Sequence, residues 1–176
     1  MNIFFLHKHP VIAAQMQCDK HVVKMVLETA QMLSTAARAK GHDIGYKSAY
    51  PKHPMTLWVG QSPDNFAWTI IHGLELCKEY TRRYNKTHKS EQYVAWFRNN
   101  LPLNIKDDVL QDFPICMKDE YKISKDPVVC YKFYYIKDKS RFAKWKHTSV
   151  PSWYLKGLKK LNSSISCSSN KDEKSK

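Results

Sequence analysis

Residues 18–40, CDKHVVKMVLETAQMLSTAARAK, decide the fold, because this long run has the apolar spacing of a single amphipathic helix. Its apolar positions would form the buried seam of that helix, and they are Val22, Val26, Thr29, Ala30, Leu33 and Ala37. Gly41 follows the run and is typical of a helix end. The rest of the chain shows no convincing strand-like alternation except IFFL at residues 3–6. We therefore predict a mainly α-helical fold built around this helix.

A polar stripe lies beside the apolar seam on the same predicted helix. His21, Lys24, Glu28 and Gln31 are spaced three or four residues apart, which places them on one helical face. An imidazole, an ammonium and a carboxylate in one row suit proton transfer, because each of them can gain or lose a proton. The same row also fits an exposed face, on which Lys24 and Glu28 form an ordinary i,i+4 ion pair. This helix alone leaves both interpretations open.

Residues 62–84, SPDNFAWTIIHGLELCKEYTRRY, predict a second long helix. Ser62 is a favourable N-cap residue, and Pro63 occupies the first helical position. This segment repeats the combination of an apolar seam with a polar stripe, and the stripe contains His72, Glu79 and Arg83. Two helices that each carry a histidine and a glutamate could face each other across a cleft, or each stripe could face water.

Proline, glycine and polar runs divide the rest of the chain. We expect an irregular connector over residues 41–54, short helices over 91–99 and 105–113, and a helix that starts at Pro127 behind the cap residue Asp126 and ends near Lys146. From residue 162 the tail NSSISCSSNKDEKSK is polar and low in apolar residues, which predicts disorder. The sequence thus predicts a single compact helical domain over residues 1–161 and a disordered polar tail over residues 162–176.

The chain is strongly basic, with 29 Lys and Arg against 16 Asp and Glu and a net charge of +13. This excess indicates a polyanionic partner, of which nucleic acid is the leading candidate and an anionic membrane surface the rival. No apolar run approaches the roughly 20 residues that span a bilayer, and the first ten residues have no hydrophobic region typical of a secretory signal. Five scattered cysteines without CxxC spacing suit free thiols in a reducing compartment. We expect an intracellular protein that is not secreted.

Positive charge is concentrated in residues 117–160, where twelve Lys and Arg stand against four Asp and Glu. Nine aromatic residues are interleaved with these charges. Lysines neutralise phosphates, and aromatic faces stack on unpaired bases, so this combination is typical of DNA contact. For any single aromatic residue, burial in the core is the better explanation, whereas the combination of charges and rings favours DNA contact.

Three segments resemble the phage endonuclease V type of pyrimidine-dimer DNA glycosylase. PSWYLKGLKKL at residues 151–161 is similar to that family's C-terminal segment, in which Pro, Ser or Thr, and Trp-Tyr introduce a basic aromatic tail. His21 and Glu28, seven residues apart, resemble the family's DNA-contacting histidine and catalytic glutamate. HPMTLWVG at residues 53–60 and the stretch up to CKEYTRRYN at 77–85 resemble its central helix. DKHVVKM and EYTxRY also resemble segments of small viral and phage proteins, a likeness that implies no chemistry.

The family resemblance implies that the N-terminal α-amine attacks C1′ of the damaged nucleotide, forms an imine and cuts the strand by β-elimination, while Glu28 stabilises the sugar cation and moves protons. An α-amine suits this role because it is less basic than a lysine side chain, so more of it is neutral near pH 7. Since Asn2 should leave the initiator methionine in place, the amine would be that of Met1. Lys20 and Lys24 are the alternative nucleophiles.

We therefore predict a DNA-binding base-excision enzyme, an endonuclease V-like pyrimidine-dimer DNA glycosylase with abasic-site lyase activity as a further step. It would act as a monomer on damaged double-stranded DNA in the cytoplasm or nucleus of a virus-infected cell. His21 and Lys24 would serve beside Glu28 as phosphate or proton-transfer groups. The predicted DNA-contacting residues are Lys20, His72, Arg83, Lys122, Lys144, Lys146, Trp153, Tyr154 and Lys156. We predict neither a metal nor a cofactor, because the histidines and cysteines lack ligand spacing and no phosphate-cradling glycine motif occurs.

Two other functions stay open. A different nucleic-acid-processing enzyme could use the pairs His21/Glu28 and His72/Glu79 on the same fold. In a non-catalytic DNA-binding protein the same pairs would be surface ion pairs. Convergence of the four side chains in one basic-rimmed cleft would favour an enzyme, and separate positions facing water would favour a binder.

Overall fold

The computed structural model describes residues 1–100 and 112–172, with the backbone alone described for residues 164–172. These residues form seven α-helices and two short 3-10 helices, and they contain no strand. In chain order the elements are α1 (Pro10–Gln15), α2 (Asp19–Arg38), α3 (Pro54–Gln61), α4 (Pro63–Tyr84), α5 (Glu91–Asn100), η1 (Asp119–Tyr121), α6 (Pro127–Lys137), η2 (Lys139–Arg141) and α7 (Ser152–Asp172). The mainly α-helical fold is confirmed.

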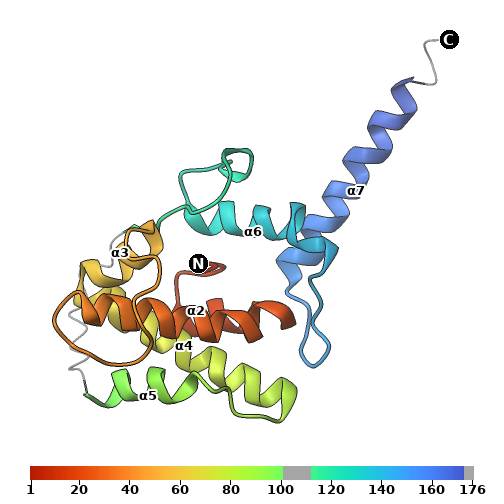
Figure 1. Ribbon diagram of the computed structural model, residues 1–176. Coiled ribbons are helices and arrows are strands. Elements are labelled where there is room, and N and C mark those ends of the chain that lie inside the picture. Colours follow the sequence, from red (N-terminus) through yellow and green to blue (C-terminus); the bar gives the residue numbers. More distant parts are fainter. Residues whose placement is uncertain (101–111, 173–176) are drawn as a thin grey trace.

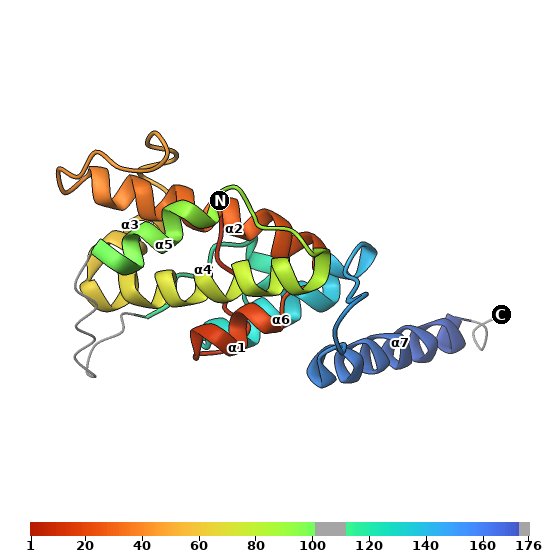
Figure 2. The ribbon, with the colours of Figure 1, turned by 90° about the horizontal axis from the view of Figure 1, so that it is seen from below.

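Helices α2 and α4 form the centre of the molecule, and α3 and α5 pack against both of them (Figures 1 and 2). The apolar seam expected on α2 is buried along its whole length, from Val22 to Ala37. A side-chain carbon at Gly73 of α4 would lie 2.8 Å from Thr29 of α2, so the missing side chain lets the two helices approach closely. No described helix is long and apolar enough to cross a membrane.

The boundaries of α4 agree with the sequence signals, and α5 begins at Glu91 as predicted and ends at Asn100, one residue later than predicted. The Ser62 hydroxyl accepts a hydrogen bond from the Asn65 amide (3.1 Å), and Pro63 is the first residue of α4. Asn85 ends α4 in the left-handed conformation, with φ 51°. Of the predicted helix over residues 105–113, all but the last two residues lie outside the described part of the chain.

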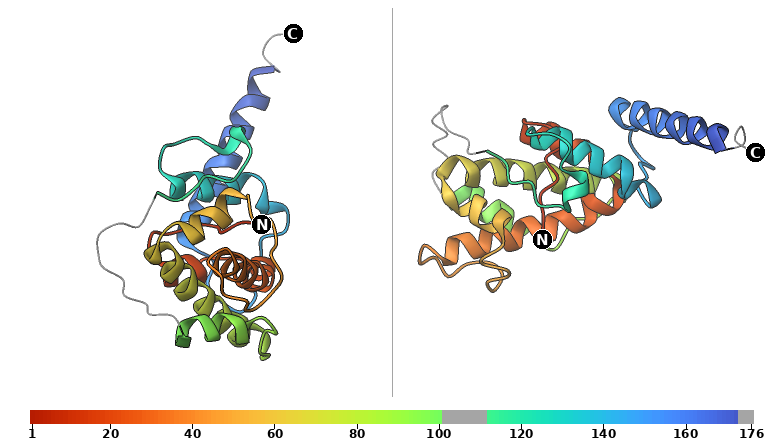
Figure 3. Two further views of the ribbon diagram at one scale, coloured as in Figure 1. Left: turned by 60° about the vertical axis from the view of Figure 1, so that its left-hand side comes forward. Right: turned by 90° about the horizontal axis from the view of Figure 1, so that it is seen from above.

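The N-terminal segment runs through the interior between α2 and α6 (Figure 1). Ile3, Phe5 and Leu6 are fully buried, and the Phe5 ring stacks on Phe113 with 3.9 Å between centroids. This segment forms neither a helix nor a strand, so the alternation of residues 3–6 does not lead to a sheet among the described residues. The left view of Figure 3 looks almost along α2 and shows the N terminus beside that helix. The chain therefore brings its first residues to the middle of α2.

Two expectations for the C-terminal part differ from the structure. Helix α6 ends at Lys137 rather than near Lys146, because the chain turns to bury Trp145, whose indole N–H donates to the Met16 carbonyl (3.2 Å). Where the sequence predicts a disordered tail from residue 162, the structure continues α7 to Asp172, and the helix projects from the body (Figure 1). No proline interrupts this run, so nothing local stops the helix. Residues 173–176 lie outside the described residues.

Candidate active site

The N terminus of the chain meets Glu28 of α2. The Asn2 backbone N–H donates to Glu28 Oε2 (2.8 Å), and the Met1 amine lies 3.8 Å from the same oxygen. The Lys24 ammonium lies 3.2 Å from the other oxygen, Oε1. The Glu28 side chain is 10% exposed, whereas that of Lys24 is 68% exposed. A nearly buried carboxylate therefore holds two amines, one on each oxygen.

Asn2 fixes the position of the N-terminal amine. Its side-chain amide donates to the Cys116 carbonyl (3.0 Å), and its side-chain oxygen accepts from the Tyr131 hydroxyl (3.0 Å). Burial raises the pKa of Tyr131, which therefore stays a neutral hydrogen-bond donor. The first residues of a chain are usually poorly ordered unless something holds them. Here Asn2, together with the buried segment that follows it, holds the amine beside Glu28.

His53 belongs to the same neighbourhood, and the sequence interpretation missed it. It precedes α3, and its Nδ1 accepts a hydrogen bond from the Met55 amide (3.1 Å), so Nδ1 carries no proton. Burial and then the positive N terminus lower the pKa of His53, whereas Glu28 acts in the opposite direction. The imidazole is therefore neutral near pH 7, with its proton on Nε2. The sequence does contain a signal for the position of His53, because this residue directly precedes Pro54, which starts α3.

His21 is a buried, neutral side chain rather than a cation. Its ring stacks on Phe4 at 4.1 Å, and Nδ1 hydrogen-bonds to the Tyr135 hydroxyl. Burial, followed by the positive charges of Lys139 and Lys24, lowers the pKa of His21 to about 3. This state does not suit an electrostatic phosphate contact, and the ring instead joins α2 to α6.

Arg83 and His72 lie in the interior, so the expectation that they contact DNA does not fit their burial. The Arg83 side chain is 0% exposed and donates to the carboxylates of Glu79 (2.6 Å) and Asp19 (3.1 Å). His72 lies against Gln17 (3.1 Å between the Nε2 atoms), and burial lowers its pKa to about 3. His72 and Arg83 are enclosed and already have partners. Through Gln17 and Asp19 they link the connection between α1 and α2 to α4.

The four side chains of the two His/Glu pairs do not converge in one cleft. Glu28 meets the N terminus and His21 meets Tyr135, whereas His72 lies against Gln17 and Glu79 pairs with Arg83. All four are buried, so they do not point to separate water-facing surfaces either. The site is built from Glu28 and the chain terminus, not from two facing stripes.

The predicted DNA-contacting side chains of the C-terminal half divide into two groups. Tyr154 is 4% exposed and packs on Trp145 (4.7 Å between centroids), and the half-buried Trp153 packs on Tyr135 (6.1 Å). The Trp-Tyr pair thus closes the core. The exposed or half-exposed lysines are Lys122, which pairs with Asp119 (2.8 Å), Lys144 and Lys146 in the loop before α7, and Lys156 on α7. Lys20, also exposed, lies near that loop at the start of α2.

When the sequence is compared with known proteins, one protein family matches it. The sequence model of the family described as pyrimidine dimer DNA glycosylase matches residues 1–92, which contain the N-terminal segment, α1 to α4 and Glu28. No curated protein and no solved structure matches the chain. The matched residues make up more than half of the chain and include both the terminal amine and the carboxylate that it meets. The chain therefore belongs to the pyrimidine dimer DNA glycosylase family and is a DNA repair glycosylase that acts on DNA.

Proposed function

We propose that this glycosylase releases a damaged pyrimidine in duplex DNA and then cuts the strand at the resulting abasic site, with the Met1 amine as nucleophile and Glu28 as the catalytic carboxylate. The observation that carries this proposal is the contact between the chain terminus and Glu28 Oε2, at 2.8 Å from the Asn2 nitrogen and 3.8 Å from the Met1 nitrogen. An amine and a carboxylate held this close can act on one sugar carbon.

The proposed reaction balances with these two groups. The neutral amine uses its lone pair to form a bond to C1′. The bond from C1′ to the base breaks, and the base leaves with the electrons of that broken bond and takes up a proton. The Glu28 carboxylate stabilises the positive charge on the sugar and accepts the proton that the attacking amine loses. The bond from C1′ to O4′ then breaks, O4′ takes up the proton held by Glu28, and C1′ and nitrogen form an imine. The Glu28 carboxylate removes a C2′ proton, and the electrons of that C–H bond expel the 3′ phosphate by β-elimination.

Met1 is a better nucleophile in this site than either lysine. Lys24 also forms an ion pair with Glu28, but its side chain is mostly exposed and has no further hydrogen bond or ion pair with a described residue. The ammonium of Lys20 lies over the Phe142 ring, 5.2 Å from the centroid, and not at Glu28. α-Amines in general are less basic than lysine side chains. Asn2 also holds the Met1 amine in position beside Glu28. Orientation of this kind is worth several kcal/mol of a reaction barrier.

The exposed positive charge and the family support an assignment of the substrate, and the likeness to viral segments supports an assignment of the cellular location. The exposed lysines, Lys122 and Lys156 among them, would contact phosphates of damaged double-stranded DNA, which a monomer can bind. The likeness of DKHVVKM and EYTxRY to viral and phage segments supports a role inside an infected host cell, in its cytoplasm or nucleus.

Strand cleavage of defined duplexes tests the proposal. Duplexes that carry a thymine dimer, an abasic site or no lesion are incubated with the protein and run on denaturing gels with and without alkali. We expect breaks at the dimer and at the abasic site without alkali, and none in the undamaged duplex. Breaks at the dimer that need alkali, with an intact abasic duplex, would contradict the lyase step. Failure to attack the dimer at all would contradict the lesion assignment.

A further inference from the structure

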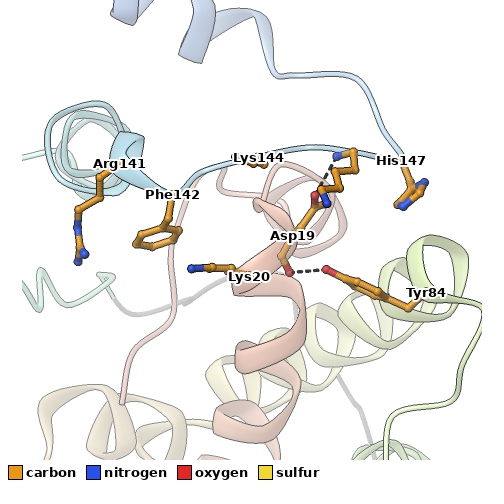
Figure 4. Close-up of a pocket in the computed structure, with 8 residues that line it drawn as sticks. Asp19, Lys20, Tyr84, Arg141, Phe142, Lys144 and His147 are labelled. Carbon is orange, nitrogen blue, oxygen red and sulfur yellow. Dashed lines mark hydrogen bonds between the residues drawn. The ribbon is translucent and has the colours of Figure 1, made fainter.

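A cavity lined by basic side chains lies at the start of α2, apart from the site around Glu28 (Figure 4). It is a cavity of about 410 Å³ between that helix end and the loop before α7, and it is lined by Asp19, Lys20, Tyr84, Arg141, Phe142, Lys144, Lys146 and His147. Lys20 and Glu28 lie eight residues apart on α2, which corresponds to roughly 12 Å along the helix axis. The cavity is therefore separate from the amine site but lies on the same helix.

The cations of this cavity outnumber its carboxylates, because four basic side chains line it and Asp19 alone is acidic among the described lining residues. Lys20, Arg141, Lys144 and Lys146 form no ion pair with any described residue. Asp19 is the one acidic lining residue, and both of its oxygens are in use, Oδ1 with Arg83 (3.1 Å) and Oδ2 with the Lys146 amide (2.8 Å). Several cations facing one space repel each other unless an anion enters it.

The backbone that carries these cations is held in place. Trp145 is buried and donates to the Met16 carbonyl (3.2 Å), so Lys144 and Lys146 on either side of it remain exposed. The Lys144 carbonyl accepts from the Asp19 amide (2.9 Å), and the His147 carbonyl accepts from Arg82 (2.9 Å). A cationic loop that is already fixed binds an anion without a large ordering cost.

The aromatic rings of the cavity are occupied, which favours a phosphate over a base as the ligand. The Phe142 ring has the Lys20 ammonium and the Arg141 guanidinium each 5.2 Å from its centroid, and Figure 4 shows Lys20 reaching toward that ring. The Tyr84 hydroxyl donates to the Asp19 carbonyl (3.2 Å), and its ring contacts Tyr80 (5.1 Å). Both rings thus already have partners, whereas the four cations form no ion pair with any described residue, so an anion is the better match for this cavity than a base.

We propose that this cavity binds a backbone phosphodiester of the DNA strand whose sugar reacts at Met1 and Glu28. The inference rests on the proposed function for the position of the reacting sugar. A DNA strand advances about 3.4 Å along the duplex axis per nucleotide, so a strand that follows α2 places the bound phosphate roughly three to four nucleotides from that sugar. Binding of this phosphate in the cavity would fix which nucleotide of the strand lies at Met1 and Glu28.

Binding to an uncleavable duplex tests the proposal independently of turnover. The probe is a duplex with a tetrahydrofuran abasic analogue, which cannot form an imine, and its affinity is measured over a range of salt concentrations. The double variant Lys20→Ala with Arg141→Ala should bind about 10-fold more weakly, with a salt slope shallower by about 1 to 2. Lys144→Ala with Lys146→Ala, which removes two exposed side chains, should give the same loss. The matched control removes two exposed lysines beyond the opposite end of α2, and Lys40→Ala with Lys47→Ala should bind within two-fold of wild type. Equal effects of this control and of the cavity variants would overturn the proposal.

Neutral linkages locate the bound phosphate. A methylphosphonate placed at one linkage at a time should weaken wild-type binding most at one or two linkages three to four nucleotides from the analogue, and the double variant should be insensitive there. Equal loss at every linkage, or a double variant that is still sensitive at that linkage, would overturn the proposal. Absence of cleavage of a thymine-dimer or natural abasic duplex would contradict the proposed function instead, while the phosphate site would stand on these binding data.

Discussion

At the scale of single residues, the proposed chemistry rests on Glu28, whose two carboxylate oxygens have different partners. One of its oxygens faces the chain terminus and the other faces Lys24, so the carboxylate balances two positive charges from a nearly buried position. Replacing it with a neutral group leaves the shape of the site intact but removes the counter-charge of both amines. The effect on turnover therefore separates a catalytic carboxylate from an ordinary helix ion pair.

Glu28→Gln should abolish turnover while sparing binding. The amide keeps the size of the side chain and can still accept a hydrogen bond from the Asn2 N–H, but it can neither take a proton nor balance a developing sugar cation. We expect a loss of roughly 10²-fold or more in single-turnover rate on a dimer duplex, with affinity within a few-fold of wild type. Glu120→Gln, at an exposed acidic residue of η1, is the control. Wild-type cleavage by Glu28→Gln would show that the carboxylate is only a partner of Lys24.

Helical spacing and the family resemblance could predict Glu28 together with Lys24 and the terminal amine, but not the contacts that hold the terminus beside Glu28. Helical spacing places Glu28 on a polar stripe, and that pattern is local. The partner of Glu28, Asn2, lies 26 residues away in sequence and is held by Cys116 and Tyr131, which come from a distant part of the chain. Spacing likewise predicted a polar face containing Arg83 without showing that buried carboxylates enclose it. Residue spacing predicts which side chains share a helical face. It does not predict whether that face is exposed or which residues pack against it.

At the scale of elements, the beginning of α7 closes the core. Tyr154 is 4% exposed against Trp145, whereas the next residue, Leu155, is 48% exposed. Lys144 and Lys146 are exposed in the loop that leads into α7. The buried rings of Trp145 and Tyr154 hold this loop against the core. Basic charge and aromatic residues alternate here because one set faces water and the other faces the interior.

Tyr154→Ala should destabilise the protein rather than weaken lesion recognition. Removing a buried aromatic side chain costs about 3–5 kcal/mol of unfolding free energy, so the midpoint of urea unfolding should fall markedly. Leu155→Ala, on the exposed side of α7, should change stability little. Near-normal stability of Tyr154→Ala together with a selective loss of affinity for damaged DNA would place the ring at the DNA instead.

The elements that sequence predicts well are those whose signals are local. Ser62 and Pro63 determine the start of α4, and an uninterrupted apolar seam determines α2. The end of α6 depends on Trp145, which binds a carbonyl 129 residues earlier in the chain, and no local pattern contains that contact. Helices α1 and α3 have 6 and 8 residues, too few to show a helical period.

At the scale of the whole molecule, the net charge of +13 should dominate the affinity for DNA. If about five phosphates are contacted, the logarithm of the association constant should fall with the logarithm of salt concentration with a slope near −4 to −5. Fluorescence anisotropy on one duplex at several salt concentrations measures this slope. A slope close to zero would show that phosphate neutralisation does not drive binding.

Stability should fall as the pH is lowered below about 6.5. An unfolded histidine has a pKa near 6.5, whereas burial lowers the pKa of His21 and of His72 to about 3. Between these values the unfolded chain binds up to two more protons than the folded one, so acid favours unfolding by up to about 1.4 kcal/mol per pH unit for each histidine. Urea unfolding at pH 7, 6 and 5 should show this decline, and it should be shallower in His72→Gln than in His42→Gln, where the histidine is exposed. Equal stability at pH 7 and pH 5 would contradict the neutral, buried state of these side chains.

Borohydride trapping followed by mapping of the adduct tests the central claim most directly, because reduction converts an imine between protein and DNA into a stable bond. The protein is incubated with an abasic duplex and borohydride, digested, and the modified peptide is identified by mass spectrometry. We expect one adduct on the amine of Met1, retained in Lys24→Gln and lost when the N terminus is acetylated. An adduct on Lys20 or Lys24, or trapping that survives acetylation of the N terminus, would contradict the assignment of the chain terminus as the nucleophile.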